Sequence, residues 1–283
     1  MRIACTADLH GNIADYRALL AFAAQRNADA VIVAGDLLPH AMRRDDALET
    51  QRRFVERDLA PVLCEFRAHH RKVEVYLLPG NDDWAAAYVA VEELAVEGLA
   101  HPLHERVYRL NDDLWIAGYA CVPLTPFSIK DFERYDEGPL PAFSFDHAFV
   151  SRGGVIRPLH RHEFEGLPSI ADELAALAGR SDPRQTVYVC HTPPVDTPLD
   201  LMPRGRHVGS RALRAFIERY QPPLTLHGHI HEAPALSGTY ATRIGATWCV
   251  NPGHDQRCFH GVLIELTDGV VHMDHTVYGT QPK

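Results

Sequence analysis

The feature that most limits what this chain can fold into is a series of short apolar runs, each ending directly in a polar cluster. Residues 2–5, 30–34, 73–78, 186–190, 224–226 and 247–250 have the length and composition of buried strands. Apolar residues at helical spacing over 13–26 join the first two runs. A strand, helix and strand in this order form a right-handed crossover, which brings the polar residues after both strands together.

The polar clusters supply a set of oxygen and nitrogen donors without any thiolate. The candidate metal ligands are Asp8, His10, Asp36, Asn81, His191, His229 and His231. Two pairs in this set are separated by one residue, so in extended backbone both side chains of a pair leave on the same side. Such donors suit Mn²⁺, Fe²⁺ or Zn²⁺, and they are too many for one ion, so we expect two divalent ions about 3.5–4 Å apart. A mononuclear zinc site is the alternative, but it needs only four of these positions.

Size and charge exclude several classes of protein. With 283 residues, of which 46% are hydrophobic, the chain can form one large α/β domain, and we expect a single domain over 1–283. A formal net charge of −9 argues against long nucleic acid as a partner. No apolar run approaches the roughly 20 residues of a membrane span and no leader-like region is present, so we expect a cytoplasmic protein with no membrane partner.

The remaining segments complete an α/β pattern. A long helix over 45–70, interrupted near Pro61, and further helices over 85–99, 169–177 and after Ser210 are expected, with hairpins over 107–119 and 262–277. This order predicts two packed mixed sheets flanked by helices. Residues 123–162 are rich in Pro and Phe and lack a sustained period, which predicts long loops or a cap over the site.

The ordered motifs resemble those of the calcineurin-like metallophosphoesterase family. They are Asp-x-His at 8–10, Gly-Asp at 35–36, Gly-Asn at 80–81, a lone His191 after a strand, and Gly-His-x-His at 228–231. The resemblance covers residues 5–253 and implies a four-layer double β-sandwich. It also implies two metal sites that share Asp36, one completed by Asp8, His10 and His231, the other by Asn81, His191 and His229. A hydroxide bridging the ions would then attack the phosphorus of a small phosphoester.

One position departs from the family pattern. Many members have His directly after Gly-Asn, where it helps to protonate the leaving oxygen, whereas this chain has Asp82. A carboxylate is a poorer donor at neutral pH unless its pKa is raised. The candidate catalytic acids are Asp82, His207 and His254. Members that resemble this chain in lacking the His often hydrolyse phosphodiesters, so a phosphodiesterase acting on a small diester, such as a nucleotide diester, is expected.

Other interpretations remain open at this point. A basic loop with Arg204 and Arg206 precedes the helix that Ser210 is placed to cap, so these arginines can hold a substrate phosphate, although a flexible surface loop fits the same residues. The alternative activities are a phosphomonoesterase and a nucleotide pyrophosphatase. A scaffold that binds protein partners without metals is less favoured, because every donor position retains a ligand type.

Overall fold

The computed structural model describes the chain apart from residues 42, 141, 256, 268–269 and 282–283. One sheet contains β1 (Arg2–Thr6), β2 (Ala30–Ala34), β3 (Glu74–Leu78), β4 (His101–Pro102), β17 (Val262–Thr267), β18 (Val270–His275) and β19 (Gly279–Gln281). The other contains β5 (Val107–Arg109), β6 (Trp115–Tyr119), β11 (Thr186–Cys190), β14 (Leu224–Leu226), β15 (Ala241–Ile244) and β16 (Thr247–Val250). The main helices are α1 (Ile13–Gln25), α2 (Ala47–Phe54), α3 (Ala60–His69), α4 (Ala85–Val96), α6 (Ile170–Ala178) and α7 (Arg211–Tyr220).

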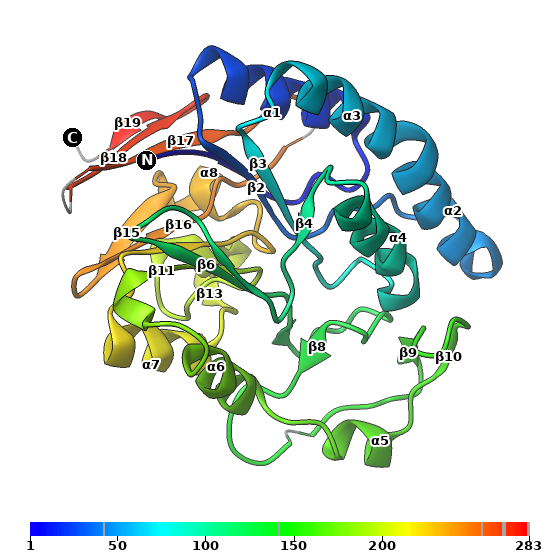
Figure 1. Ribbon diagram of the computed structural model, residues 1–283. Coiled ribbons are helices and arrows are strands. Elements are labelled where there is room, and N and C mark those ends of the chain that lie inside the picture. Colours follow the sequence, from blue (N-terminus) through cyan, green and yellow to red (C-terminus); the bar gives the residue numbers. More distant parts are fainter. Residues whose placement is uncertain (42, 141, 256, 268–269, 282–283) are drawn as a thin grey trace.

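Both sheets are mixed, and helices cover their outer faces. The strand orders are β19-β18-β17-β1-β2-β3-β4 and β15-β16-β14-β11-β6-β5. Figure 1 shows α1, α2 and α3 over the first sheet and α6 and α7 on the far side of the second. The expected α/β fold of two mixed sheets flanked by helices is therefore confirmed. No helix within the described residues is long and apolar enough to cross a membrane.

Parallel strands form the centre of each sheet. In the first, β2 pairs in parallel with β1 and β3, and in the second β11 pairs in parallel with β6 and β14. The five residues of β2 and the five of β11 are buried, which fits the uninterrupted apolar runs seen in the sequence. Polar residues that follow these strands therefore collect at the carboxyl ends of both sheets.

The long helix over 45–70 is present, together with its interruption near Pro61. A wider π-helical turn, Val55–Leu59, joins α2 to α3, and Pro61 lies in the first turn of α3. The wider turn ends two residues before the proline, whose missing amide removes one hydrogen bond of the continuous helix.

Residues 123–162 contain more order than their sequence pattern suggests. The short strand pairs are β7 (Val122–Pro123) with β8 (Glu133–Arg134) and β9 (Phe149–Val150) with β10 (Arg157–Pro158), followed by α5 (Arg161–Glu165). Ala148, Val150, Leu159 and Phe164 form a small apolar cluster. Figure 1 shows the elements of this segment, α5, β9 and β10, in the lower right part of the molecule. The cap role of this segment stays a prediction.

Candidate metal centre

The carboxyl ends of the two sheets bring several predicted ligands together. Asp8 follows β1, Asp36 follows β2 and His191 follows β11, and each offers a ligand atom within 4.8 Å of the other two. All three side chains are buried. His10 belongs to the same region, because its Nε2 lies 3.8 Å from Oδ2 of Asp36. Two carboxylates and a histidine from both sheets therefore face one buried point.

Several donors have an unusual backbone conformation. Asp8, His10, Asp36 and His229 have φ values of 58°, 44°, 51° and 66°, in the left-handed region that residues with side chains rarely adopt. The same-side argument from extended backbone was therefore wrong for both pairs. The loop that carries Asp8 and His10 curls because Asp8 N donates to Gly35 O and His10 N donates to Asp36 O. In the other pair, the side chain of His231 is about half exposed. Such strain persists where surrounding contacts enforce it, and functional sites are a common place for it.

Glycines in the motifs allow this close packing. A Cβ on Gly35 would collide with the ring of His191, and Gly35 itself has a φ of +113°. A Cβ on Gly80 would overlap Asp36 and His191, and one on Gly228 would lie 2.8 Å from Oδ2 of Asp8. Each glycine therefore leaves room for donors that converge from other loops.

Buried atoms without hydrogen-bond partners show that the donor set fits a cation. Oδ2 of Asp8, Nδ1 of His10, Oδ1 of Asn81 and Nε2 of His191 are buried and unpartnered, which is costly unless something else binds them. Nδ1 of His191 donates to Ala34 O at 2.8 Å, so in neutral histidine Nε2 presents a lone pair. That lone pair faces Oδ2 of Asp36 at 3.3 Å, and two acceptors at this distance are stable only with a proton or a metal ion between them.

The ionisation of these groups follows from burial and from one another. Burial raises the pKa of Asp8 to about 6 and lowers the pKa of His229 to about 3. Burial opposes the charged forms of Asp36 and His191 as well, but their mutual attraction is stronger, so the pKa of Asp36 falls below its usual value and that of His191 rises to about 9. Without metal, Asp36 and His191 share one proton, and a metal cation would suit the same position between the two side chains.

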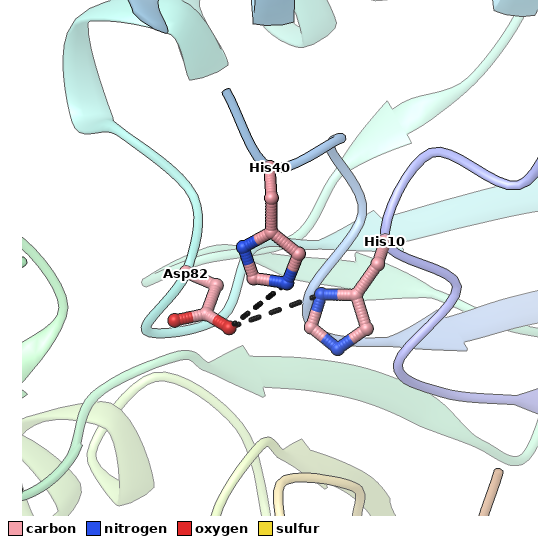
Figure 2. A group of neighbouring side chains, drawn as sticks. All are labelled: His10, His40 and Asp82. Atoms are coloured by element: carbon pink, nitrogen blue, oxygen red, sulfur yellow. Dashed lines mark ion pairs between the residues drawn. The ribbon is translucent and has the colours of Figure 1, made fainter. Parts of the chain in front are cut away.

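A second cluster lies beside the first and includes a residue that the sequence analysis missed. One carboxylate oxygen of Asp82 lies 3.5 Å from Nε2 of His40 and 3.9 Å from Nδ1 of His10, and Figure 2 shows this oxygen facing both rings. The two imidazoles stack with their centroids 4.6 Å apart. Burial, reinforced by the charges of Asp36 and Asp83, raises the pKa of Asp82 to about 8. His40 follows Pro39 outside any recognised motif, so only the folded structure reveals it.

Two further buried residues hold the loops of this cluster in place. The carboxylate of Asp83 accepts hydrogen bonds from the amides of Leu37, Leu38 and Gly80 at 2.8–3.0 Å. Gln51 of α2 donates to Pro39 O and to Asp82 O at 3.2 and 3.1 Å. Asp83 could have been noticed as a second acid after Gly-Asn, whereas Gln51 lies in a helix and carries no sequence signal.

The other predicted site residues have separate surroundings. Nδ1 of His207 donates to Oδ1 of Asp200 at 2.7 Å, and Arg204 and Arg206 are exposed. The amide of His254 donates to His231 O, which places it next to a predicted ligand. The roles assigned to these residues in protonation and phosphate binding stay predictions.

Ser210 caps α7 as predicted, because its hydroxyl accepts from Leu213 N. The carboxylate of Asp136 accepts from the hydroxyl of Ser210 and from the amide of Arg211 at 2.5 and 2.6 Å. An acid from the 123–162 segment thus already occupies this helix N-terminus. Phosphate binding there would rest on the side chains of Arg204 and Arg206 alone.

Two helix-flanked sheets with a buried carboxylate and imidazole cluster at their strand ends define an α/β protein with a candidate metal centre. A sequence model of calcineurin-like phosphoesterases matches residues 1–233. The chain belongs to the calcineurin-like phosphoesterase family, and membership supports a metal-dependent phosphoester hydrolase.

Solved structures share the fold over almost the whole chain. The protein TT1561 of Thermus thermophilus is similar with a TM-score of 0.58 and 19% identity, over 96% of this chain and 97% of that one. A dimetal phosphatase from Danio rerio is similar with a TM-score of 0.57 and 12% identity, over 97% and 95%. At these identities the likeness concerns the fold alone. A search of curated protein sequences gave no match.

Proposed function

We propose that this protein is a phosphodiesterase that uses two divalent metal ions to hydrolyse a small phosphodiester. The observation that carries the proposal is the set of buried, unpartnered donor atoms on Asp8, Asn81 and His191 at the meeting point of the two sheets. Aspartate at position 82, in place of the histidine typical of many relatives, favours a diester over a monoester. A phosphomonoesterase and a nucleotide pyrophosphatase are the alternatives.

The proposed ligand sets share Asp36 between the two ions. Asp8, His10 and His231 complete one site, and Asn81, His191 and His229 complete the other. Their oxygen and nitrogen donors suit Mn²⁺, Fe²⁺ or Zn²⁺. Bound there, the ions would neutralise phosphate charge and lower the pKa of water.

The chain's own contacts orient these ligands. The amide of His229 donates to Oδ1 of Asp8 at 2.9 Å, and the amide of Asp82 donates to Oδ1 of Asp36 at the same distance. Each bond uses Oδ1 of its aspartate and leaves Oδ2 of the same carboxylate for a metal ion. Among the candidate acids, Asp82 is the one adjoining two imidazoles, so we assign it and His40 to holding a proton near the leaving oxygen. Residues 123–162 would serve as the cap, and all six cysteines are free, which favours a cytoplasmic location.

The test combines metal content with substrate preference. Purified protein is analysed for bound metal and assayed on bis-p-nitrophenyl phosphate and p-nitrophenyl phosphate, with Mn²⁺ and with a chelator. We expect about two metals per chain and faster diester hydrolysis that the chelator abolishes. Protein that binds no metal and stays inactive after Mn²⁺ is supplied would contradict the proposal.

Asp36→Ala gives the sharper test of the shared ligand. We expect the variant to lose metal and at least about 10²-fold in kcat for the diester, because both sites lose a ligand. Asp113→Ala is a matched control, since Asp113 is exposed on the loop between β5 and β6. Full turnover by Asp36→Ala would remove the bridging role.

A further inference from the structure

A cavity opens directly beside the His10, His40 and Asp82 cluster. Its volume is about 440 Å³, within the range of small-molecule sites. Its lining includes His40 and Asp82 of that cluster, the adjacent Arg43 and Arg44, and Phe127 of the 123–162 segment. A group attached to a phosphate at the candidate metal centre would therefore extend into this space.

Arg43 and Arg44 give the lining of the cavity two positive charges, although the chain as a whole has a net charge of −9. The only acid that pairs with Arg43 within the described residues is Asp45, at 3.3 Å, and both side chains are largely exposed, so the pair contributes little. The guanidinium of Arg44 lies 3.6 Å above the ring of Phe149. This contact uses its flat face and leaves the N–H groups at its edge available to an anion.

Phe127 gives the lining of the cavity a fixed apolar surface. Phe127 is 56% exposed, although it is a large hydrophobic residue. Its carbonyl accepts a hydrogen bond from Nζ of Lys130, and Lys130 is held in a fully buried ion pair with Glu133 at 2.8 Å. The loop that carries Phe127 is therefore anchored, and its ring is available to a planar group of a ligand.

We propose that this cavity binds the ester group of the substrate and that Arg43 and Arg44 hold a second anionic group carried by it. Phe127 contacts the planar part of the same ester group. The substrate class is thus a nucleotide-like phosphodiester with an additional phosphate, as opposed to a diester with neutral substituents. This inference rests on the proposed function for the reacting phosphate.

The test uses two substrates that differ only in the second anion. They are thymidine 5′-(p-nitrophenyl phosphate) and the same compound with a 3′-phosphate, and both release p-nitrophenol. We expect the Mn²⁺-loaded protein to favour the 3′-phosphorylated compound by about tenfold or more in kcat/KM, because charge-assisted hydrogen bonds are the strong ones. In the double variant Arg43→Ala/Arg44→Ala this preference should fall to about one, mainly through KM.

Controls separate local recognition from net charge. Arg71→Ala/Lys72→Ala removes two adjacent, exposed positive charges from the loop before β3 and should keep the preference. Arg44→Lys should retain part of it, and Phe127→Ala should raise KM for both thymidine compounds equally. The circular dichroism spectrum and the thermal unfolding midpoint of the arginine variants should match those of the wild type, which verifies their folding.

The outcomes distinguish this inference from the proposed function. Wild-type protein that hydrolyses bis-p-nitrophenyl phosphate but treats both thymidine compounds alike would overturn the inference and leave the proposed function intact. A preference that persists in Arg43→Ala/Arg44→Ala would overturn it too. Protein that hydrolyses none of the diesters with Mn²⁺ would overturn the proposed function itself.

Discussion

Gly80 lies where the Asp36 carboxylate and the His191 ring both approach the main chain, since an added Cβ would overlap Oδ1 of Asp36 and lie 2.6 Å from Nε2 of His191. Glycine is needed at this position because of side chains from neighbouring loops, not because of the conformation of the local turn. Its amide also donates to Oδ2 of Asp83 at 2.8 Å, and the same carboxylate accepts hydrogen bonds from the amides of Leu37 and Leu38. Because Gly80 has no Cβ, Asp36 from one sheet and His191 from the other can come close together.

Gly80→Ala should weaken metal binding by at least about tenfold and cost about 1–3 kcal/mol of unfolding free energy, because the new methyl group pushes Asp36 and His191 apart. Metal titration and urea unfolding measure the two effects. Gly166→Ala is the matched control, since the nearest atom to its added Cβ would be a backbone oxygen 3.6 Å away. Unchanged metal affinity in Gly80→Ala would contradict the expected crowding.

His275 is buried in its neutral form. Nε2 donates to Pro252 O at 2.8 Å, while Nδ1 accepts from the amide of Val277 at 2.9 Å. Only 3% of the residue is exposed to solvent. Burial lowers its pKa to about 4. Between that value and about 6.5, the usual pKa of an unfolded histidine, the unfolded state binds more protons than the folded one. This contribution to stability is present above about pH 6.5 and is lost as the pH falls towards 4.

His275→Gln removes this titration. As the pH falls from 6.5 to 4.5, the wild type should lose up to about 1.4 kcal/mol per pH unit more unfolding free energy than the variant does. Urea unfolding at several pH values, with chelator present throughout, measures the difference. Parallel curves for the two proteins would show that His275 does not contribute.

At the level of elements, Asp136 links the 123–162 region to the second sheet's helices. Its carboxylate binds Ser210 and the first amides of α7, and its carbonyl accepts from Ala171 N at the start of α6. A single residue thus satisfies donors at the N-termini of two helices. Position 136 has no sequence signal for this, because its partners lie 35 to 76 residues away.

Asp136→Ala should cost about 1–2 kcal/mol of unfolding free energy, because it leaves donors at the N-terminus of α7 without their acceptor. Thermal or urea unfolding measures this loss. Glu137→Ala, a change at the exposed neighbour, should leave stability within about 0.5 kcal/mol of the wild type. Equal stability of both variants would show that water replaces Asp136 at the helix end.

The sequence predicts the elements better than it predicts the contacts between loops. Apolar runs such as 30–34 and 186–190 are strands because their side chains are buried on both faces, and that pattern is local. The left-handed backbone at Asp8 and His229 is not local, since it depends on hydrogen bonds with other loops. His40 lacks a motif for the same reason: its position beside Asp82 is set by Gln51 and Asp83 from elsewhere in the chain.

At the scale of the whole molecule, the candidate metal centre joins the two sheets. Asp8 and Asp36 leave the seven-stranded sheet, and His191 leaves the six-stranded one. An ion bound by all three would link the halves of the fold, and it would bind the folded state but not the unfolded chain. Stability and metal binding should therefore be coupled.

Chelation should lower the unfolding free energy by about 4 kcal/mol, relative to protein in metal at 1,000 times its dissociation constant. Differential scanning fluorimetry with Mn²⁺ or with chelator measures the accompanying fall in Tm. The Asp36→Ala variant should unfold at the same temperature in both conditions. A wild-type Tm that ignores the chelator would contradict coupling between the metal and the fold.

The placement of β1 has a consequence for how the chain is made. β1 lies in the interior of its sheet, and one of its edges pairs with β17, where Arg2 faces Glu265. At roughly 5–20 residues per second, translation leaves that edge without its partner for about 13–50 s. An open apolar strand edge recruits wrong partners. The nascent chain is therefore expected to need protection on the ribosome until its last strands emerge.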